Sequence, residues 1–302
     1  MPYMQSLRTL NIEELRCNAF AQDGQQFDMC RLEDFLQESA MGSHVHRHNY
    51  YMLMYVCRGQ GQQLIDFAHH DVLPGRFFLM YPGQVHAWGS HDGLEGHLIF
   101  FTPAFFTERY NNNNLREFPF FNTSHFLPYI DLSAPQAASF GYLLEAMLKE
   151  YHAKEEDYLK TLRSFLNILL YQCKRFYFER AQASLPANDR TAVLIVRRFE
   201  QLIEEQFREK RLVRDYAQLL LLTPNYLNAI CSRVVGKSAG ELIRERVMLE
   251  AKRLLLHDGR TVAEIGASLN FDDNSYFGRF FKKYEGLSPE QFRKSIHQNH
   301  SG

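Results

Sequence analysis

The chain of 302 residues is 45% hydrophobic and 23% charged, enough apolar material for two folded domains. Its five cysteines are scattered and form no CxxC pair, so we expect no disulfide framework and place the protein in a reducing cytoplasm. The chain has no apolar run of roughly 18 residues and its start lacks the pattern of a signal peptide, so we expect neither a membrane span nor a signal peptide.

The charge is unevenly distributed along the chain. Residues 1–130 contain eight arginines, no lysine and thirteen acidic residues, a formal charge of −5. Residues 188–302 contain nineteen basic and fifteen acidic residues, a formal charge of +4. We therefore expect only the C-terminal part to bind a polyanion such as DNA.

The first half of the chain has the pattern of a β domain. Residues 1–24 are expected to form an N-terminal arm. From residue 25 to 130, short apolar runs alternate with Gly and Pro turns such as Pro74–Gly75 and Pro82–Gly83. This spacing is typical of an all-β sandwich or barrel.

The period changes to a helical one over residues 131–182. Apolar residues at helical spacing form a stripe there: Leu159, Leu162, Phe165, Leu166, Leu169, Leu170 and Cys173. The stripe could pack on the chain's own β domain or pair with a second copy. We treat the segment as a helical linker or dimerisation segment of a homodimer, followed by an interdomain linker at 183–190.

Residues 191–302 are predicted to form short helices with a diverged internal repeat. Segments 213–236 and 262–286 can be aligned. In this alignment Ala217 corresponds to Gly266 at an offset of 49, and Gly236 corresponds to Gly286 at an offset of 50. The length and pattern predict two helix-turn-helix units. The small residues at Ala217 and Gly266 mark where the two helices of each unit cross closely.

The second helix of each unit has an apolar and a polar face. Thr223, followed by Pro224, and Asp272 or Asp273 are the predicted N-caps. The residues expected to be buried are Leu227, Ile230, Cys231 and Val234 in the first unit and Tyr276, Phe277, Phe280, Phe281 and Tyr284 in the second.

The polar faces fit the major groove of DNA. Asn pairs with adenine and Arg with guanine, whereas basic side chains at the edge bind phosphates. The predicted base-contacting residues are Asn225, Asn228, Asn274, Ser275 and Arg279. The predicted phosphate-contacting residues are Arg233, Lys237, Lys282 and Lys283. The alternative is that these are ordinary polar faces of a helical scaffold that binds protein.

Residues 238–294 contain "AKRLL", "VAEIGASLNF", "SYFGRFFKKYEG" and "SPEQFR", which resemble the signature of the AraC/XylS family of bacterial transcription regulators in order and spacing. The resemblance covers roughly 191–296. It implies an AraC-type DNA-binding domain over 191–302, with a long helix near 239–257 holding the recognition helices about one DNA turn, roughly 34 Å, apart. It also implies promoter DNA as partner, RNA polymerase as a further candidate, and activation as the commoner mode.

Two positions depart from the family pattern. Ala229 stands where the first unit often has a basic residue, and the run "LLLL" at 219–222 stands where a glycine is common. The second unit is therefore expected to contribute more of the sequence specificity.

The segment "HVHRHNYY" places His44, His46 and His48 at alternating positions, which point to one face of a β-strand. With "PGRFFLMYPGQVHAWG", this region resembles a cupin-like sensor domain. Metal cupins bind their metal ion through three His and one Glu. His46, His48 and His86 could be the three His, but the Glu position falls at Met52 or Leu53.

We therefore expect an effector pocket rather than a metal site, with no cofactor and no enzymatic activity. The predicted lining is His46, Arg47, His48, Tyr50, Tyr51, His86 and Trp88. The predicted effector is a small aromatic carboxylate or a sugar. Two alternatives remain open: three His can hold a catalytic metal, which would make the chain a metal-dependent cupin enzyme fused to a DNA-binding module, or the cluster is structural.

The sequence thus predicts a mixed two-domain protein: an N-terminal all-β cupin-like barrel followed by helices, then an all-α tandem helix-turn-helix domain. The predicted function is a cytoplasmic, effector-controlled transcription regulator.

Overall fold

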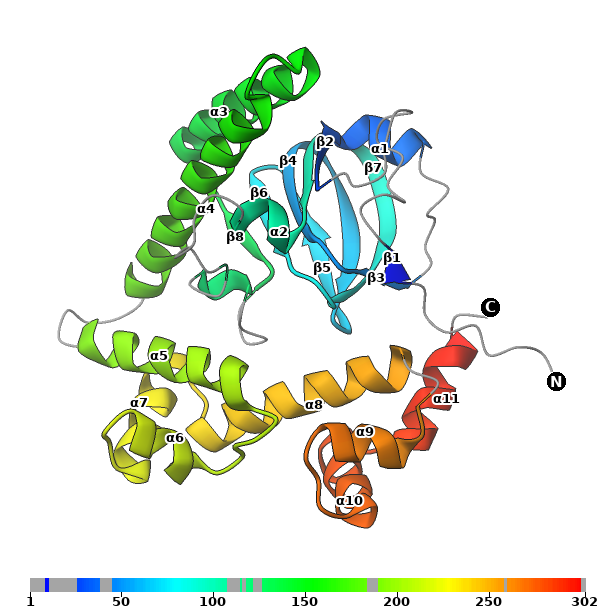
Figure 1. The fold of residues 1–302 in the computed structure, drawn as a ribbon, viewed down its shortest axis with the longest axis vertical. Helices are drawn as coiled ribbons and strands as arrows, with labels where there is room; N and C mark the ends of the chain where they lie inside the picture. The colour runs from blue at the N-terminus through cyan, green and yellow to red at the C-terminus, as the bar shows by residue number, and fades with distance from the viewer. Residues whose placement is uncertain are drawn as a thin grey trace. The chain divides into compact units, whose positions relative to one another are not determined.

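The computed structural model describes residues 9–10, 26–38, 45–107, 115, 118–121, 127–183, 190–257 and 260–299. These residues form two compact units, one with all the described strands and helices α1 to α4, the other with helices α5 to α11 (Figure 1). The predicted order of a sheet-rich domain followed by a helical domain is confirmed.

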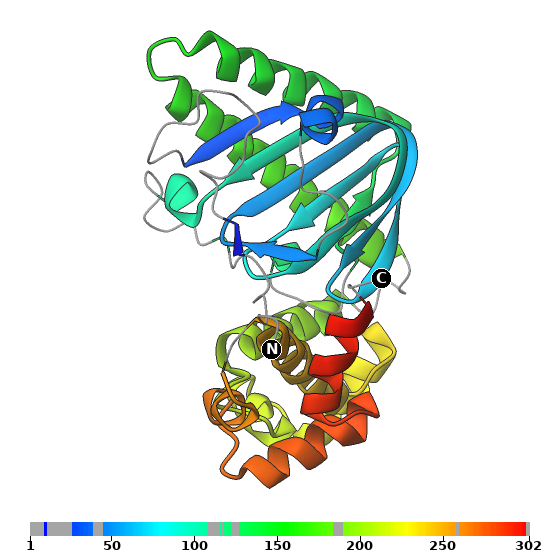
Figure 2. The same ribbon diagram turned by 90° about the vertical axis from the view of Figure 1, so that its right-hand side faces the viewer.

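The strands of the first unit form one curved sheet of eight described strands (Figure 2). Their bounds are β1 Thr9–Leu10, β2 Phe27–Arg31, β3 His46–His48, β4 Tyr51–Ile65, β5 Ala68–Val72, β6 Arg76–Met80, β7 Val85–Phe101 and β8 Tyr129–Asp131. The order is β1-β3-β7-β4-β6-β8, with β2 also paired to β7 and β5 to β4. The long β4 and β7 pair antiparallel along most of their length, with register shifts between Val56 and Gln63 that let the sheet bend.

Both faces of this sheet are buried, which explains why "YMLMYV" shows no polar alternation. Leu53 and Tyr55 of β4 belong to one apolar core, which also contains residues of the helices α2 Pro103–Thr107, α3 Ala134–Ala153 and α4 Tyr158–Ala183 and of the short 3-10 helix η3 Pro119–Phe121. Met52 and Met54 belong to a second core on the other face, together with Leu32 and Phe35 of α1 Leu32–Glu38.

The apolar stripe of residues 159–173 packs within its own chain. Leu162, Leu166, Leu169, Leu170 and Cys173 are each 0% exposed and lie in the first core. The prediction that this stripe forms a dimer interface is therefore wrong for its buried members, because they already pack against residues of the sheet and of α3. Leu159 alone among the stripe's leucines remains substantially exposed, at 41%.

The second unit consists of short helices around one long helix. Their bounds are α5 Arg190–Gln206, α6 Val213–Leu219, α7 Pro224–Val235, α8 Ala239–His257, α9 Val262–Ser268, α10 Asn274–Glu285 and α11 Pro289–Asn299. Helix α8 contacts α5, α6 and α7 as well as α9, α10 and α11. This confirms the prediction of a long connecting helix near 239–257 (Figure 1).

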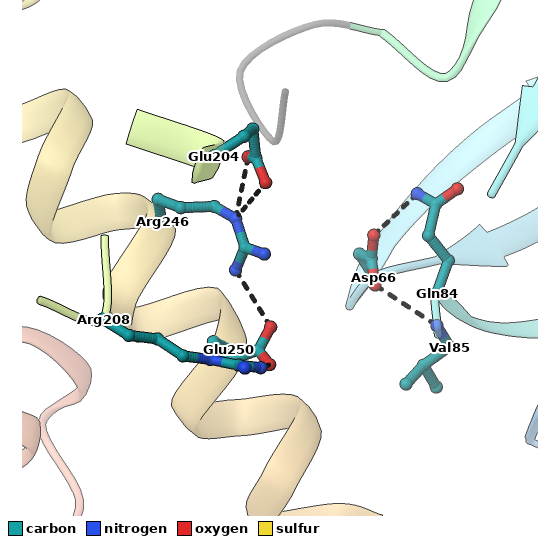
Figure 3. Close-up of polar contacts among 7 residues, drawn as sticks. All are labelled: Asp66, Gln84, Val85, Glu204, Arg208, Arg246 and Glu250. Carbon is teal, nitrogen blue, oxygen red and sulfur yellow. Dashed lines mark hydrogen bonds and ion pairs between the residues drawn. The ribbon is translucent and has the colours of Figure 1, made fainter. Parts of the chain in front are cut away.

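A cluster of charged residues, of which only Arg208 is largely exposed, joins α5 and the residues after it to α8 (Figure 3). The Arg246 Nε donates to both carboxylate oxygens of Glu204 at 2.8 Å, and its Nη1 donates to Glu250 at 3.0 Å. Arg208 Nη2 donates to the second oxygen of Glu250 at 2.7 Å. Each carboxylate therefore has a cationic partner, which offsets the cost of removing it from water.

No helix in the described part of the chain is long and apolar enough to cross a membrane.

Candidate DNA-binding helices and effector site

The two helix-turn-helix units have the same turn geometry. The Leu222 amide donates to the Ala217 carbonyl at 2.8 Å, and the Phe271 amide donates to the Gly266 carbonyl at 2.9 Å. In each turn one residue has a left-handed backbone, with φ of 56° in the first unit and 59° in the second, at Leu221 and Asn270. The predicted repeat is thus confirmed as a structural repeat.

The helix caps agree with the sequence prediction. The Thr223 hydroxyl accepts a hydrogen bond from the Tyr226 amide at 3.2 Å, and Pro224 follows in the first turn. In the second unit Asp273, rather than Asp272, is the cap, and its carboxylate accepts from the Ser275 amide at 2.8 Å. These caps fix where α7 and α10 begin.

The repeat extends further than the sequence comparison indicated. Helices α8 and α11 also begin alike: the Ser238 amide donates to Glu241 at 2.7 Å, and the Ser288 amide donates to Gln291 at 2.9 Å. An alignment continued past Gly286 at the same offset of 50 would have paired these serines.

The buried faces of α7 and α10 are mostly as predicted. Leu227, Ile230, Cys231, Phe277 and Phe281 are each at most 1% exposed. A Cβ atom added to Gly266 would lie 3.3 Å from atoms of Phe277, which confirms the close helix crossing at that position.

The prediction that Tyr276 and Tyr284 are buried is wrong. They are 50% and 44% exposed. Each ring lies at the edge of the core, Tyr276 against Phe271 with centroids 5.6 Å apart and Tyr284 against Phe280 at 5.2 Å. Tyrosine suits such an edge because its ring packs while its hydroxyl stays in water.

The polar faces of α7 and α10 point to solvent. The predicted DNA-contacting residues that are exposed are Asn225, Asn274, Ser275, Arg279, Arg233, Lys237, Lys282 and Lys283, and Asn228 is partly exposed. The Arg279 side chain is 72% exposed and lies 3.9 Å from the Asp273 carboxylate. Lys237 forms a surface ion pair of 2.8 Å with Glu245. Such exposed pairs are weak and can be exchanged for contacts to DNA.

The sheet-rich unit brings three histidines together. His46 of β3 pairs with His86 of β7, and their ring centroids are 4.1 Å apart. The His48 ring lies 4.6 Å from His86 and stacks on Tyr50 at 4.2 Å. All four side chains are buried. His44 lies outside the described residues.

Burial keeps two of these imidazoles uncharged. Burial lowers the pKa of His48 to about 3; the hydrogen bond to the Tyr50 carbonyl acts in the opposite direction, and nearby His46 lowers it further. The pKa of His86 is also well below its ordinary value, because of burial and then of His46 and His48. Both rings are therefore neutral at pH 7.

The hydrogen bonds indicate which nitrogens are free. The His48 Nδ1 donates to the Tyr50 carbonyl at 2.9 Å, so its Nε2 has a free lone pair. The Gln63 amide lies 3.5 Å from His86 Nδ1, an arrangement in which the amide donates and His86 Nε2 carries the proton. Within the described residues, both Nε2 atoms and the Gln63 Oε1 are buried without a hydrogen-bond partner.

A polar turn positions the start of β7, which carries His86. The Asp66 carboxylate accepts hydrogen bonds from the Gln84 side chain at 2.7 Å and from the Val85 amide at 3.2 Å (Figure 3). Sequence reasoning missed Gln63, Asp66 and Gln84.

The other predicted effector residues do not all lie with the histidines. Tyr50 and Trp88 both belong to the second core, on the face of the sheet opposite to the helices α3 and α4. Tyr51 instead stacks on Phe101 at 5.0 Å in the other core. Arg47 lies between two inward residues of β3, so it is on the opposite face from them. The prediction of a single lining is wrong for these two because strand side chains alternate.

Among the described residues, no group of three or more His, Cys, Asp or Glu side chains is arranged to hold a metal ion. The position expected for a carboxylate ligand is occupied by Met52 and Leu53, which are 2% and 0% exposed and pack in opposite cores.

Comparison with known proteins identifies both units. The family described as "AraC-like ligand binding domain" matches residues 26–163, and the family described as "Helix-turn-helix domain" matches residues 216–295. The Arabinose operon regulatory protein of Escherichia coli (strain K12) is 27% identical over 248 residues, covering 80% of each chain. The Msm operon regulatory protein of Streptococcus mutans is 34% identical over 104 residues, covering 34% of this chain and 37% of that protein.

Among solved structures, the C-terminal domain of AraT, a response regulator from Geobacillus stearothermophilus, is 33% identical. It covers 33% of this chain and 84% of its own, with a TM-score of 0.32.

Proposed function

Since the chain belongs to the AraC family of ligand-responsive transcription regulators, we propose that it binds promoter DNA through α7 and α10, placed in two successive major grooves. The observation that carries this proposal is the repeated turn geometry, which leaves one capped helix per unit with an exposed polar face. Helices of this kind insert their N-terminal residues against base edges.

The exposed side chains suggest which residues contact bases and which contact phosphates. Asn225, Asn228, Asn274, Ser275 and Arg279 are proposed to contact bases. Arg233, Lys237, Lys282 and Lys283 are proposed to contact phosphates, which set position rather than sequence. The first unit has Ala229 at the place equivalent to Arg279, so the second unit supplies the stronger base contact.

The effector is proposed to be an uncharged, hydroxyl-bearing small molecule such as a sugar. The free lone pair on His48 and the free N–H on His86 suit a hydroxyl group, which both donates and accepts. A carboxylate would place a negative charge beside two neutral, buried rings, at a high desolvation cost. The name of the arabinose operon relative agrees with this choice of ligand class.

Effector binding is proposed to be coupled to a rearrangement of the sheet-rich unit. His48 and His86 are each 1% exposed, so a ligand reaches them only when neighbouring elements move. Such a ligand shifts the equilibrium between two arrangements because it binds one of them better.

We further propose that the protein acts as a homodimeric activator in the cytoplasm, contacts RNA polymerase and catalyses no reaction. The relatives found by comparison are regulators, which supports the non-enzymatic role. Sedimentation velocity tests the dimer, and elemental analysis of the purified protein tests the metal-enzyme alternative: a stoichiometric metal lost on His46→Ala would favour that alternative.

The experiment for the DNA-binding proposal is a salt-titrated gel shift on DNA selected from random sequence by the full chain. Affinity should fall steeply with salt, because phosphate contacts release counterions. Arg279→Ala should weaken discrimination at one base pair by roughly 1–3 kcal/mol. Arg214→Ala serves as a charge-matched control on α6, since its side chain is also exposed, at 75%. Absent or salt-insensitive binding would instead support a protein-binding scaffold.

A further inference from the structure

Arg211 links the two helix-turn-helix units. It lies two residues before α6 of the first unit, yet its side chain contacts the turn of the second unit, 58 residues further along the chain. Its Nη2 donates to the Leu269 carbonyl at 2.6 Å and also to the Asn270 carbonyl. Its guanidinium carbon lies 3.7 Å from the centre of the Phe271 ring.

The groups that Arg211 contacts are those that determine the direction of α10. Leu269 is the C-cap of α9, where carbonyls lack helical partners and the negative end of the helix dipole lies. Asn270 is the left-handed residue of the turn. The Phe271 ring packs on Phe277 and Phe280 of α10, with centroids 5.0 and 5.2 Å apart. A guanidinium suits this place because it can donate to carbonyls and stack on a ring at once.

A second attachment holds the C-terminal end of α10. Lys252 of α8 forms a 2.5 Å ion pair with Glu285 at the last turn of α10. Through Lys252 the second unit is joined to the connecting helix, and through Arg211 it is joined to the start of the first unit. These two attachments act in addition to the packing of α9, α10 and α11 on α8, and further restrict rotation of the second helix-turn-helix unit.

We propose that Arg211 is a positioning residue that fixes the orientation of α10 relative to α7, and so makes the protein sensitive to the spacing between its two half-sites in DNA. The inference rests on the proposed two-groove binding. One inserted base pair moves the second groove by about 3.4 Å and about 35° around the duplex. A rigid pair of helices loses contacts on such DNA, whereas a loosely joined pair can follow the groove.

The first experiment needs no DNA. Spin labels are placed at Ser232→Cys in α7 and Lys283→Cys in α10, both exposed, in a full-length Cys17→Ser, Cys57→Ser background. Pulsed dipolar spectroscopy should give a narrow distance distribution for this protein and a roughly twofold broader one for Arg211→Ala. Arg214→Ala, which removes the same charge from the same segment, should leave the distribution narrow. An unchanged distance distribution in Arg211→Ala would overturn the proposed role of Arg211. It would not affect the proposal that both helix-turn-helix units bind DNA.

The second experiment measures affinity on the selected DNA and on versions with one base pair added or removed between the half-sites. The parent protein and Arg214→Ala should lose about tenfold or more on the altered spacings. Arg211→Ala should lose less than about threefold. Arg211→Lys, which keeps the charge but cannot donate to two carbonyls and stack in the same way, should behave similarly if Arg211→Ala folds poorly by circular dichroism.

The outcomes separate the two proposals. A full spacing penalty in folded Arg211→Ala and Arg211→Lys overturns the role of Arg211 alone. A parent protein that binds selected DNA with no dependence on spacing overturns the two-groove proposal and this inference with it.

Discussion

Glu200→Gln should remove a large pH dependence from the stability of the helical unit. Glu200 is 2% exposed on α5, which packs against α7. Burial raises the pKa of its carboxyl from 4.5 to about 8; Arg197 partly opposes this, and Glu204 adds to it. The folded state therefore holds a proton that the unfolded state has lost between these two pH values.

The sign and size follow from proton linkage. Because the folded state binds more protons, the free energy of unfolding falls as pH rises from about 4.5 to about 8 and then levels off. At about 1.4 kcal/mol per pKa unit, this group alone lowers it by roughly 3 kcal/mol at pH 7 and roughly 5 kcal/mol above pH 8. Glutamine keeps the shape and cannot ionise, so the variant should match the parent near pH 5 and exceed it increasingly toward pH 9.

The assay is urea unfolding at pH 5, 7 and 9, followed by circular dichroism of the helices. The chain has a single tryptophan, Trp88, in the sheet unit, so its fluorescence provides an internal control that the substitution should leave unchanged. A constant difference between variant and parent at all three pH values would refute the reasoning.

Glu250→Gln provides the matched control with the opposite sign. Burial alone would raise the pKa of Glu250, but Arg246, Arg253 and the hydrogen bond from Arg208 outweigh it and bring the pKa down to about 2. Its charge therefore stabilises the folded state above about pH 4.5, and this stability is lost as pH falls toward 2. The substitution should cost roughly 3 kcal/mol across pH 5 to 9.

Four further substitutions test the turns, the helix crossing and the effector site. Leu221→Gly should raise the free energy of unfolding by about 0.5–1 kcal/mol, since Leu221 has φ of 56° and is 93% exposed. Asn270→Leu should lower the free energy of unfolding by about 1 kcal/mol. Urea midpoints that move in the opposite directions would contradict both predictions. Gly266→Val should cost about 1–3 kcal/mol, because even a Cβ there lies 3.3 Å from Phe277, and an unchanged midpoint would disprove the tight crossing. In a thermal-shift screen of neutral sugars, a sugar that raises the melting temperature of the parent should fail to do so for His48→Ala, which should still bind DNA; an equal shift in both proteins would rule out His48 as a ligand contact.

The parts that could be predicted from the sequence are local ones. The caps at Thr223 and Asp273, the buried Leu227 and Phe277, and the close crossing at Gly266 depend on residues near one another in the chain, so spacing alone indicates them. The repeat strengthened each of these predictions because two segments had to fit the same geometry.

The contacts that sequence reasoning missed join distant segments. Nothing near Arg211 indicates that it meets carbonyls 58 residues away, because a backbone acceptor leaves no mark in the sequence. The stripe on α4 matched packing on the sheet and pairing with a second chain equally well, since periodicity shows a buried face but not what covers it.

The separation of Tyr51 and Arg47 from the histidines had a signal that was available. His46, His48 and Tyr50 are even-numbered on adjoining strand segments, and Arg47 and Tyr51 are odd-numbered, so strand alternation alone places them on opposite faces. Gln63 had no such signal, because the bulges in β4 shift its register relative to β7.

The most direct test of the central claim is methylation interference at guanine N7 on DNA selected by the full chain, since this atom lies in the major groove. Two-groove binding predicts two clusters of interfering positions on one face of the duplex, about 10 base pairs apart, and loss of contacts in only one cluster for Arg279→Ala. A single cluster, or two clusters half a turn apart on opposite faces, would contradict the account.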